Sequence, residues 1–429
     1  MHVELGYALA PPASPGIGRA SLDRLDVHVA DAHGRIAEGV AVGETGYCAL
    51  DLYNRVDLGA IEEVVDGLPE YDSVLVVGIG GSALGARTAA SALAPTADFY
   101  VLDTLDPDYL EPLLERIDMD RTVCHVVSKS GSTVETRAVF DRVTTAMADA
   151  GVDWTDRTIA TTGADGPLGR RIEAADATRL DPPAGVPGRY SVLSTMALPS
   201  LAAVGIDIEG LLVGAERAHR SLSPSLYETP AYAFGAAMAA LANRGATQNA
   251  FVTYGEAISD LGDWFAQLWA ESLGKDALGQ TPIPGRGVAD HHSQLQRWRA
   301  GRRDLVVTTV ATDPTEQAAT EIEGAGMVDL GELQALERRA MTASLGAAGV
   351  PAVEVHLGEL DPASLGATFV SLEAATMLVA ELWGIDAFDQ PAVDWAKSAV
   401  RGELGLEMVD ERPSLDSDDR LRVELERRG

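Results

Sequence analysis

Lysine is nearly absent from this chain of 429 residues. Only Lys129, Lys275 and Lys397 occur among 33 basic residues, against 65 acidic residues, and the formal net charge is −32. Such a surface repels nucleic acid and anionic lipid, so neither is expected as a partner. Adaptation to high salt, which screens the self-repulsion of an acidic surface, is one explanation. An arginine-biased, GC-rich genome encoding an ordinary acidic protein is the other, but the size of the negative charge favours a halophilic protein.

Cysteine and long apolar segments are also scarce. The two cysteines, Cys48 and Cys124, exclude a disulfide framework and suit a reducing compartment. Polar residues, glycine or proline interrupt every apolar run before it reaches the length that crosses a bilayer. Residues 1–15 lack the basic start and apolar block of an export signal. A cytoplasmic location is therefore expected.

Two sets of alternating strands and helices are predicted. Short apolar segments at 73–78, 98–102, 121–127 and 157–161, and then at 249–254, 304–309 and 352–357, alternate with helical stretches. This alternation is typical of parallel sheets covered on both faces. The predicted class is α/β, with two tandem doubly wound domains. The predicted boundaries are 1–45 for an arm and helix, 46–200 and 201–400 for the two domains, and 401–429 for a tail or terminal helix.

A glycine-rich turn follows the first predicted strand, at residues 78–85. Its glycines, Gly81 among them, allow backbone N–H groups to approach an anion, and Ser82 could cap the next helix or donate to a phosphate. Close packing of helix against strand explains the glycines equally well. A dinucleotide site is a third possibility, because Asp103 after the next strand could bind a ribose, although the spacing is not that of the dinucleotide motif.

A second polar loop follows the third predicted strand and opens a helix. Here the helix dipole favours negative charge, and no base-stacking or ribose-binding feature accompanies the hydroxyl groups. A helix cap with additional serines is the alternative, but one of only three lysines lies here. The loop predicts a site for the phosphate of a small molecule, and its six residues are Ser128, Lys129, Ser130, Gly131, Ser132 and Thr133.

These loops resemble the two halves of a sugar-isomerase (SIS) domain. Further motifs, in order between about residues 70 and 400, narrow the resemblance to the phosphoglucose isomerase family, and the other two lysines lie within them. The motifs are Gly-Arg-Tyr-Ser at 188–191, Gln267 with Ala-Glu-Ser-Leu-Gly-Lys at 270–275, His292-Ser293 with Gln296, and Phe-Asp-Gln at 388–390 with Lys397.

The resemblance implies an aldose–ketose isomerase of glycolysis and gluconeogenesis, acting on glucose 6-phosphate and fructose 6-phosphate through an enediol. Glu271, expected on a polar turn before Gly274, would transfer the proton between neighbouring carbons, a task for one carboxylate held over both. Arg189 would stabilise the developing negative charge. Gln267 would contact the substrate.

Ring opening is assigned by the same resemblance to His292, assisted by Lys397. Histidine titrates in the range that this step needs, but His291 is adjacent and residue type alone does not choose between them. The spacing to Gln296 and Gly301 favours His292. In this family the histidine reaches the neighbouring subunit's site, so the resemblance implies a homodimer.

No cofactor or metal is expected, because acid–base isomerisation needs neither and the histidines have no carboxylate pair at ligand spacing beyond Asp290. Three alternatives remain. They are a bifunctional phosphoglucose/phosphomannose isomerase, a catalytically silent SIS-domain sensor of a sugar phosphate, and a nicotinamide-dependent dehydrogenase.

Overall fold

The computed structural model describes residues 1–313, 319–324 and 326–406. Residues Met1–Phe388 form one compact unit and Asp389–Gly429 a second. The described part of the second unit consists mainly of helix α15 (Pro391–Glu403). Most of the predicted tail, from residue 407 onward, lies outside the described residues. The predicted domain boundaries within the chain remain a prediction.

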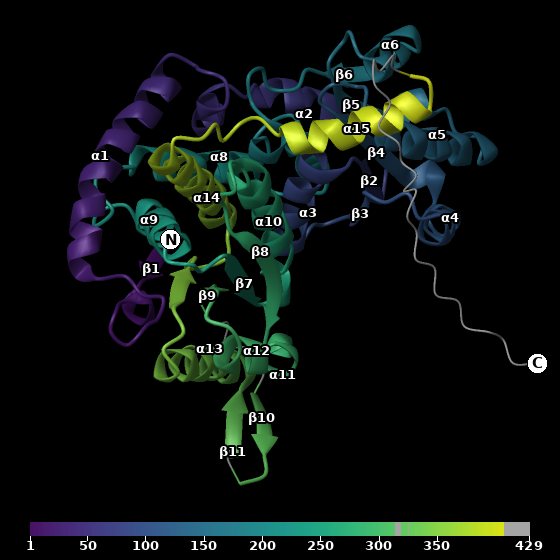
Figure 1. Ribbon diagram of the computed structural model, residues 1–429. Helices are drawn as coiled ribbons and strands as arrows, with labels where there is room; N and C mark the ends of the chain where they lie inside the picture. Colours follow the sequence, from purple (N-terminus) through teal and green to yellow (C-terminus); the bar gives the residue numbers. More distant parts are fainter. Residues whose placement is uncertain (314–318, 325, 407–429) are drawn as a thin grey trace, which may run out of the picture. The chain divides into compact units, whose positions relative to one another are not determined.

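The first sheet contains five parallel strands in the order β3-β2-β4-β5-β6 (Figure 1). Its central strands are buried throughout, as expected of a parallel sheet covered on both faces. The strands are β2 (Ser73–Val77), β3 (Asp98–Leu102), β4 (Thr122–Ser128), β5 (Thr158–Thr162) and β6 (Thr178–Leu180).

Alternating side chains of this sheet enter two different apolar clusters. On one face, Leu75 and Val126 pack with residues of α4 (Pro107–Arg116), α5 (Val134–Asp149) and α6 (Pro167–Ala174). On the other face, Val76 and Val127 belong to the main core with residues of α2 (Leu58–Asp66), α3 (Leu84–Leu93) and α7 (Leu198–Ala203). The sheet is therefore doubly wound.

The second sheet has the order β1-β12-β9-β7-β8 and is parallel except for the N-terminal strand β1. Strand β1 pairs antiparallel with β12, so the N-terminal segment contributes directly to this sheet. The strands are β1 (His2–Glu4), β7 (Gln248–Tyr254), β8 (Thr281–Gly287), β9 (Leu305–Ala311) and β12 (Ala352–His356).

Helices also cover both faces of the second sheet. Residues of α12 (Leu295–Ala300) and α13 (Leu330–Ala347) pack on one face, and residues of α9 (Pro230–Ala242), α10 (Asp260–Leu273) and α14 (Pro362–Trp383) on the other. Among the described helices, α14 alone is long and apolar enough to cross a membrane, yet 89% of its apolar window is buried within the protein. It is the core helix of this unit.

The remaining elements lie around these layers. The helices are α1 (Arg19–Ala41), α8 (Ile208–Arg220) and α11 (Ala289–Ser293), and β10 (Ala319–Ile322) pairs with β11 (Gly326–Asp329) in a hairpin. Short 3-10 helices occur at η1 (Gly6–Ala8), η2 (Tyr47–Asn54), η3 (Gly80–Ser82), η4 (Met119–Arg121), η5 (Trp154–Arg157), η6 (Gly188–Tyr190) and η7 (Glu256–Ile258).

The α/β class and the parallel sheets flanked by helices confirm the sequence prediction. The prediction missed β1, β6, β8 and the β10–β11 hairpin. Strand β8 was not predicted because Pro282 and Pro284 have no backbone N–H to donate to a neighbouring strand. It forms at the sheet edge, where proline is tolerated.

Candidate active site

Both predicted anion-binding loops leave the first sheet from adjacent strands. Strand β2 pairs with β4, and the chain turns in opposite directions from these strands because β3 lies beyond β2 and β5 beyond β4. The carboxyl ends of β2 and β4 therefore flank the crevice in which open α/β sheets bind ligands. Gly78 lies close to β4, since a Cβ built on it would be 3.2 Å from the Val127 carbonyl oxygen.

The 128–133 loop presents hydroxyl groups at the start of α5. The Ser130 and Ser132 Oγ atoms are 2.8 Å apart, and Ser130 Oγ accepts the Ser132 backbone N–H at 3.2 Å. Thr133 is the N-cap residue but its hydroxyl does not cap the helix; it lies 3.3 Å from Ser128 Oγ instead. The helix N-terminus and its hydroxyls thus remain available to an anion.

Gly131 makes the turn of this loop possible. Its φ of +64° lies in the left-handed region, and a Cβ there would stand 2.8 Å from Thr162 Oγ1. Glycine alone meets both conditions without strain. The buried Gly131 therefore lets the loop pass close to the end of β5.

Lys129 is the cation of this loop. Its Nζ donates to the Val186 carbonyl oxygen at 2.6 Å. Burial lowers the pKa of Lys129 from its usual value, because desolvation disfavours the charged form. The contact ties the loop to the segment that leads into η6, where Arg189 lies.

The glycine-rich turn after β2 packs against that same segment. A Cβ on Gly81 would lie 2.4 Å from the Gly188 carbonyl carbon, and one on Gly80 would lie 2.7 Å from Gln267 Nε2. Gly80 also has a φ of +60°. Close contact of the turn with Gly188 and Gln267 therefore accounts for these glycines. The predicted contact of Gly81 with a phosphate stays a prediction. Ser82 lies at the end of η3 and does not cap α3, so the helix-capping alternative is wrong. Its predicted donation to a phosphate stays a prediction.

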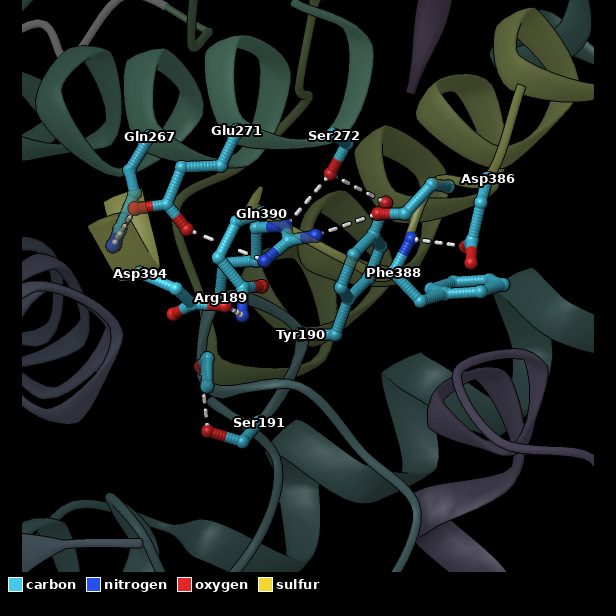
Figure 2. A network of polar contacts seen from close by, with 12 residues as sticks. Arg189, Tyr190, Ser191, Gln267, Glu271, Ser272, Asp386, Phe388, Gln390 and Asp394 are labelled. Carbon is cyan, nitrogen blue, oxygen red and sulfur yellow. Dashed lines mark hydrogen bonds and ion pairs between the residues drawn. The ribbon is translucent and has the colours of Figure 1, made fainter. Parts of the chain in front are cut away.

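Arg189 joins this segment to helix α10. Its Nη1 lies 3.3 Å from Glu271 Oε2, and Gln267 Nε2 donates to the other carboxylate oxygen at 3.1 Å (Figure 2). The Glu271 side chain is 24% exposed, whereas that of Arg189 is 2% exposed. The carboxylate is thus held from both sides and still reaches solvent. The structure brings together Arg189, Gln267 and Glu271, as the sequence motifs predict.

Two further residues hold the guanidinium of Arg189. Its Nε donates to Ser272 Oγ at 2.9 Å, and Ser272 Oγ is also 2.9 Å from the Tyr190 hydroxyl. Its Nη2 donates to the Ala387 carbonyl oxygen at 2.7 Å. Tyr190 and Ser272 belong to the sequence motifs at 188–191 and 270–275, but no role was predicted for either residue. Their adjacency to Arg189 and Glu271 was the available signal.

Glu271 lies in a helix, which corrects the expected polar turn. Helix α10 continues to Leu273, and Gly274 follows as its C-cap residue. Gln267 and Glu271 are four positions apart and consequently share one face of α10. The helix gives the carboxylate a more rigid support than a loop would.

The structure does not place His292 with Glu271 in one chain. Helix α10 runs antiparallel to β8: a Cβ on Gly262 would meet Pro284, and a Cβ on Gly279, just before β8, would meet Leu273. Glu271, near the end of α10, therefore lies near the start of β8, whereas His292 lies on α11, which follows the end of β8. Seven strand residues separate these ends, on the order of 20 Å. The side chain of His292 is exposed.

Two other predicted residues belong to other elements of the fold. Lys397 lies on α15, in the second compact unit, with an exposed side chain. Asp103, the candidate ribose-binding acid, is engaged by Arg87, whose Nη1 lies 2.9 Å from its Oδ2. Within the described residues, no three histidine, cysteine or acidic side chains are grouped closely enough to hold a metal ion.

Comparison with known proteins agrees with this geometry. The family model described as phosphoglucose isomerase matches residues 52–282. A probable glucose-6-phosphate isomerase of the halophilic archaeon Haloarcula marismortui is 47% identical over 99% of each chain. A hypothetical protein of Thermus thermophilus shares the fold with a TM-score of 0.83 and 29% identity, covering 94% of this chain and 99% of its own.

A glucose-6-phosphate isomerase structure from Chlamydia trachomatis aligns with a TM-score of 0.69 and 19% identity, covering 88% of this chain and 78% of that one, and shows the shared fold. The family model matches more than half of the chain, and the Haloarcula relative is 47% identical over almost the whole length. This chain therefore belongs to the phosphoglucose isomerase family.

Proposed function

We propose that this chain catalyses the reversible isomerisation of glucose 6-phosphate to fructose 6-phosphate. The observation that carries the proposal is the partly exposed Glu271 carboxylate beside the buried Arg189 guanidinium. The segment that contains Arg189 also contacts Lys129 in the 128–133 loop, at the start of α5. Isomerisation of a phosphorylated sugar needs three features of the protein, namely an acid–base group, a fixed cation and an anion site.

The phosphate group is assigned to the 128–133 loop. The hydroxyls of Ser130, Ser132 and Thr133 and the first N–H groups of α5 supply donors, and Lys129 supplies a positive charge. These local donors overcome the repulsion of an anion by the acidic surface, because short-range hydrogen bonds act where the long-range field is screened. The anchored phosphate fixes the distance from the loop to the reacting carbons.

The proton transfer is assigned to Glu271. Its carboxylate removes the proton from C2 of the open-chain aldose, the C–H electrons form the C1–C2 double bond of an enediolate, and the carbonyl oxygen becomes negative. The proton of the C2 hydroxyl moves to the negative O1, and the carboxylic acid gives its proton to C1 as the electrons on O2 form the C2 carbonyl, which yields the ketose. Gln267 holds Oε1 and Arg189 holds Oε2, so the carboxylate stays oriented through both transfers.

Arg189 is assigned a second task in the transition state. Its guanidinium is buried and held by Ser272 and the Ala387 carbonyl oxygen, so it does not need to reorganise when charge develops on the enediolate. Its positive charge favours the anionic intermediate next to the base.

Ring opening is assigned to His292 of a second copy of the chain. Within one chain His292 and Glu271 lie at opposite ends of β8, too far apart to act on one hexose. A homodimer in which each histidine enters the other copy's site resolves this separation. Lys397 is assigned to the ring oxygen by its family motif alone, and a cytoplasmic role in glycolysis and gluconeogenesis is part of the proposal.

The experiment has two parts. Purified protein is assayed with glucose 6-phosphate and with mannose 6-phosphate. The second substrate is included because protonation of the enediolate on its other face at C2 would give mannose 6-phosphate. Both assays are run at low and at multi-molar salt, because the acidic surface suggests adaptation to salt. Turnover of glucose 6-phosphate alone supports the proposal, turnover of both indicates the bifunctional enzyme, and binding without turnover indicates a sensor.

Shared sites are tested by co-expressing two differently tagged inactive variants, E271Q and H292Q. A hybrid dimer should recover one complete site, containing Glu271 of one copy and His292 of the other. Hybrids that stay as inactive as the separate variants would contradict the shared-site arrangement.

A further inference from the structure

Helix α11, which carries His292, has only five residues. A helix of this length is unstable without tertiary contacts. Its position therefore depends on what its side chains hold. The side chains of Asp290, His291 and Ser293 form hydrogen bonds, whereas the side chain of His292 takes part in none of the hydrogen bonds or ion pairs of the described residues and is exposed.

His291 forms the main anchor of this helix. Its Nε2 lies 2.5 Å from the Tyr254 hydroxyl at the end of β7, and its Nδ1 faces Glu337 Oε2 of α13 at 3.6 Å. The His291 side chain is 8% exposed. Burial lowers the pKa of His291, so the neutral ring accepts a hydrogen bond from the Tyr254 hydroxyl at Nε2 and directs its Nδ1–H toward Glu337.

The Tyr254 ring is itself fixed by the end of β8. A Cβ on Gly287 would lie 2.3 Å from the ring, so only glycine permits this contact immediately before α11. Tyr254 is 2% exposed. Its hydroxyl therefore has a defined position to offer to His291.

Asp290 provides a second anchor. Its Oδ2 accepts the Arg286 backbone N–H at 2.7 Å, and its Oδ1 accepts the Ser293 hydroxyl at 2.5 Å. These bonds close the turn from β8 into α11. With His291 they hold the backbone on both sides of His292.

We propose that His291 is a positioning residue, which with Tyr254 and Glu337 clamps α11 so that His292 projects outward in the orientation needed for ring opening. The inference rests on the proposed role of His292. His291 does not touch the substrate; it acts through its neighbour. The arrangement also accounts for two adjacent histidines with opposite exposure.

The test is a double-mutant cycle on kcat with glucose 6-phosphate. His291→Leu removes both contacts and should lower kcat by roughly 10- to 100-fold, the scale of a displaced catalytic group, with little change in KM. In a His292→Gln background the same change should cause no further loss, because groups that act as one unit are non-additive.

Two milder variants keep the test decisive if H291L does not fold. Y254F removes one hydroxyl and should lower kcat in the same direction, whereas H291Q retains an acceptor for that hydroxyl and should restore most of the rate. Tyr53, whose hydroxyl lies 3.0 Å from His219 Nδ1 in a similar pair, supplies the matched control, and Y53F should leave kcat unchanged.

The outcomes separate the two proposals. A low rate in H292Q with full activity in both H291L and Y254F would overturn the positioning role alone. The same holds if losses in H291L and H292Q multiply. Full activity in H292Q would overturn the catalytic role of His292 and this inference with it.

Discussion

Arg189 and Glu271 are separated by 82 positions, yet Nη1 of one lies 3.3 Å from Oε2 of the other. The contact joins the segment that follows the first sheet to a helix covering the second. Because Lys129 and Gly81 pack on the same segment, the anion-binding loop and the carboxylate are held in one structural unit. The proposed chemistry depends on this connection.

Removing hydroxyls from the 128–133 loop should weaken substrate binding more than turnover. Ser130→Ala combined with Thr133→Ala should raise KM by on the order of tenfold with a smaller fall in kcat, since two phosphate hydrogen bonds contribute about equally to the ground state and transition state. Steady-state kinetics measure this. Thr145→Ala, an exposed hydroxyl farther along α5, is the control. A fall in kcat at unchanged KM would contradict the assignment.

His125 should make the protein sensitive to mild acid. It is fully buried on β4, its Nε2 is 2.9 Å from Thr161 Oγ1, and its Nδ1 has no partner among the described residues. Burial lowers its pKa to about 3. The unfolded state takes up a proton below about pH 6.5, so folding stability falls by about 1.4 kcal/mol per pH unit between that pH and the lowered pKa.

Chemical unfolding at several pH values measures this loss. His125→Gln should flatten the acid slope relative to the unmutated protein, whereas His28→Gln, at an exposed position, should not. An unchanged slope in H125Q would show that other groups cause the acid sensitivity.

Glu373 should cost stability at neutral pH. It is 1% exposed within α14, and neither carboxylate oxygen has a hydrogen-bond partner in the part of the chain that the structure describes. Burial raises the pKa of Glu373 well above the usual value. Its contribution is most favourable below the unfolded pKa, near 4.5, and is lost as pH rises toward the raised pKa, by about 1.4 kcal/mol per unit. Glu373→Gln, which resembles the protonated acid, should therefore raise Tm at pH 7 and lose this advantage near pH 4.

Thermal unfolding at the two pH values tests the prediction for Glu373. The control is Glu38→Gln on α1, where the side chain is exposed. A lower Tm for E373Q at pH 7 would indicate that the ionised carboxylate is stabilising.

The two sheets were predictable because their central strands are short apolar segments between clear helix and turn signals. Strand β8 was not, since its prolines are acceptable only at an edge, and edge position is a property of the assembled sheet. Strand β1 was missed for a similar reason: three residues form a strand only because β12 is there to pair with them.

The site residues were found from motifs, but their connections required coordinates. Sequence placed Glu271 on a turn because Gly274 follows closely, whereas α10 continues to Leu273. No local pattern predicts the hydrogen bond between Ser272 and Tyr190 next to Arg189, because these two residues are 82 positions apart in the sequence. The separation of Glu271 from His292 likewise follows only from the direction of α10 along β8.

The central claim is that Glu271 transfers a proton on a phosphorylated sugar, and solvent exchange tests it most directly. Fructose 6-phosphate is incubated in D2O with the unmutated protein, with Glu271→Gln and with Asp263→Asn, another carboxylate of α10, and the products are followed by NMR. The partly exposed Glu271 carboxyl group can exchange the proton that it has removed for a deuteron before returning it. The account therefore predicts glucose 6-phosphate carrying deuterium at C2 with the unmutated protein and D263N, and a rate on the order of 10²- to 10⁴-fold lower with E271Q. Exchange by E271Q at the rate of the unmutated protein would contradict it.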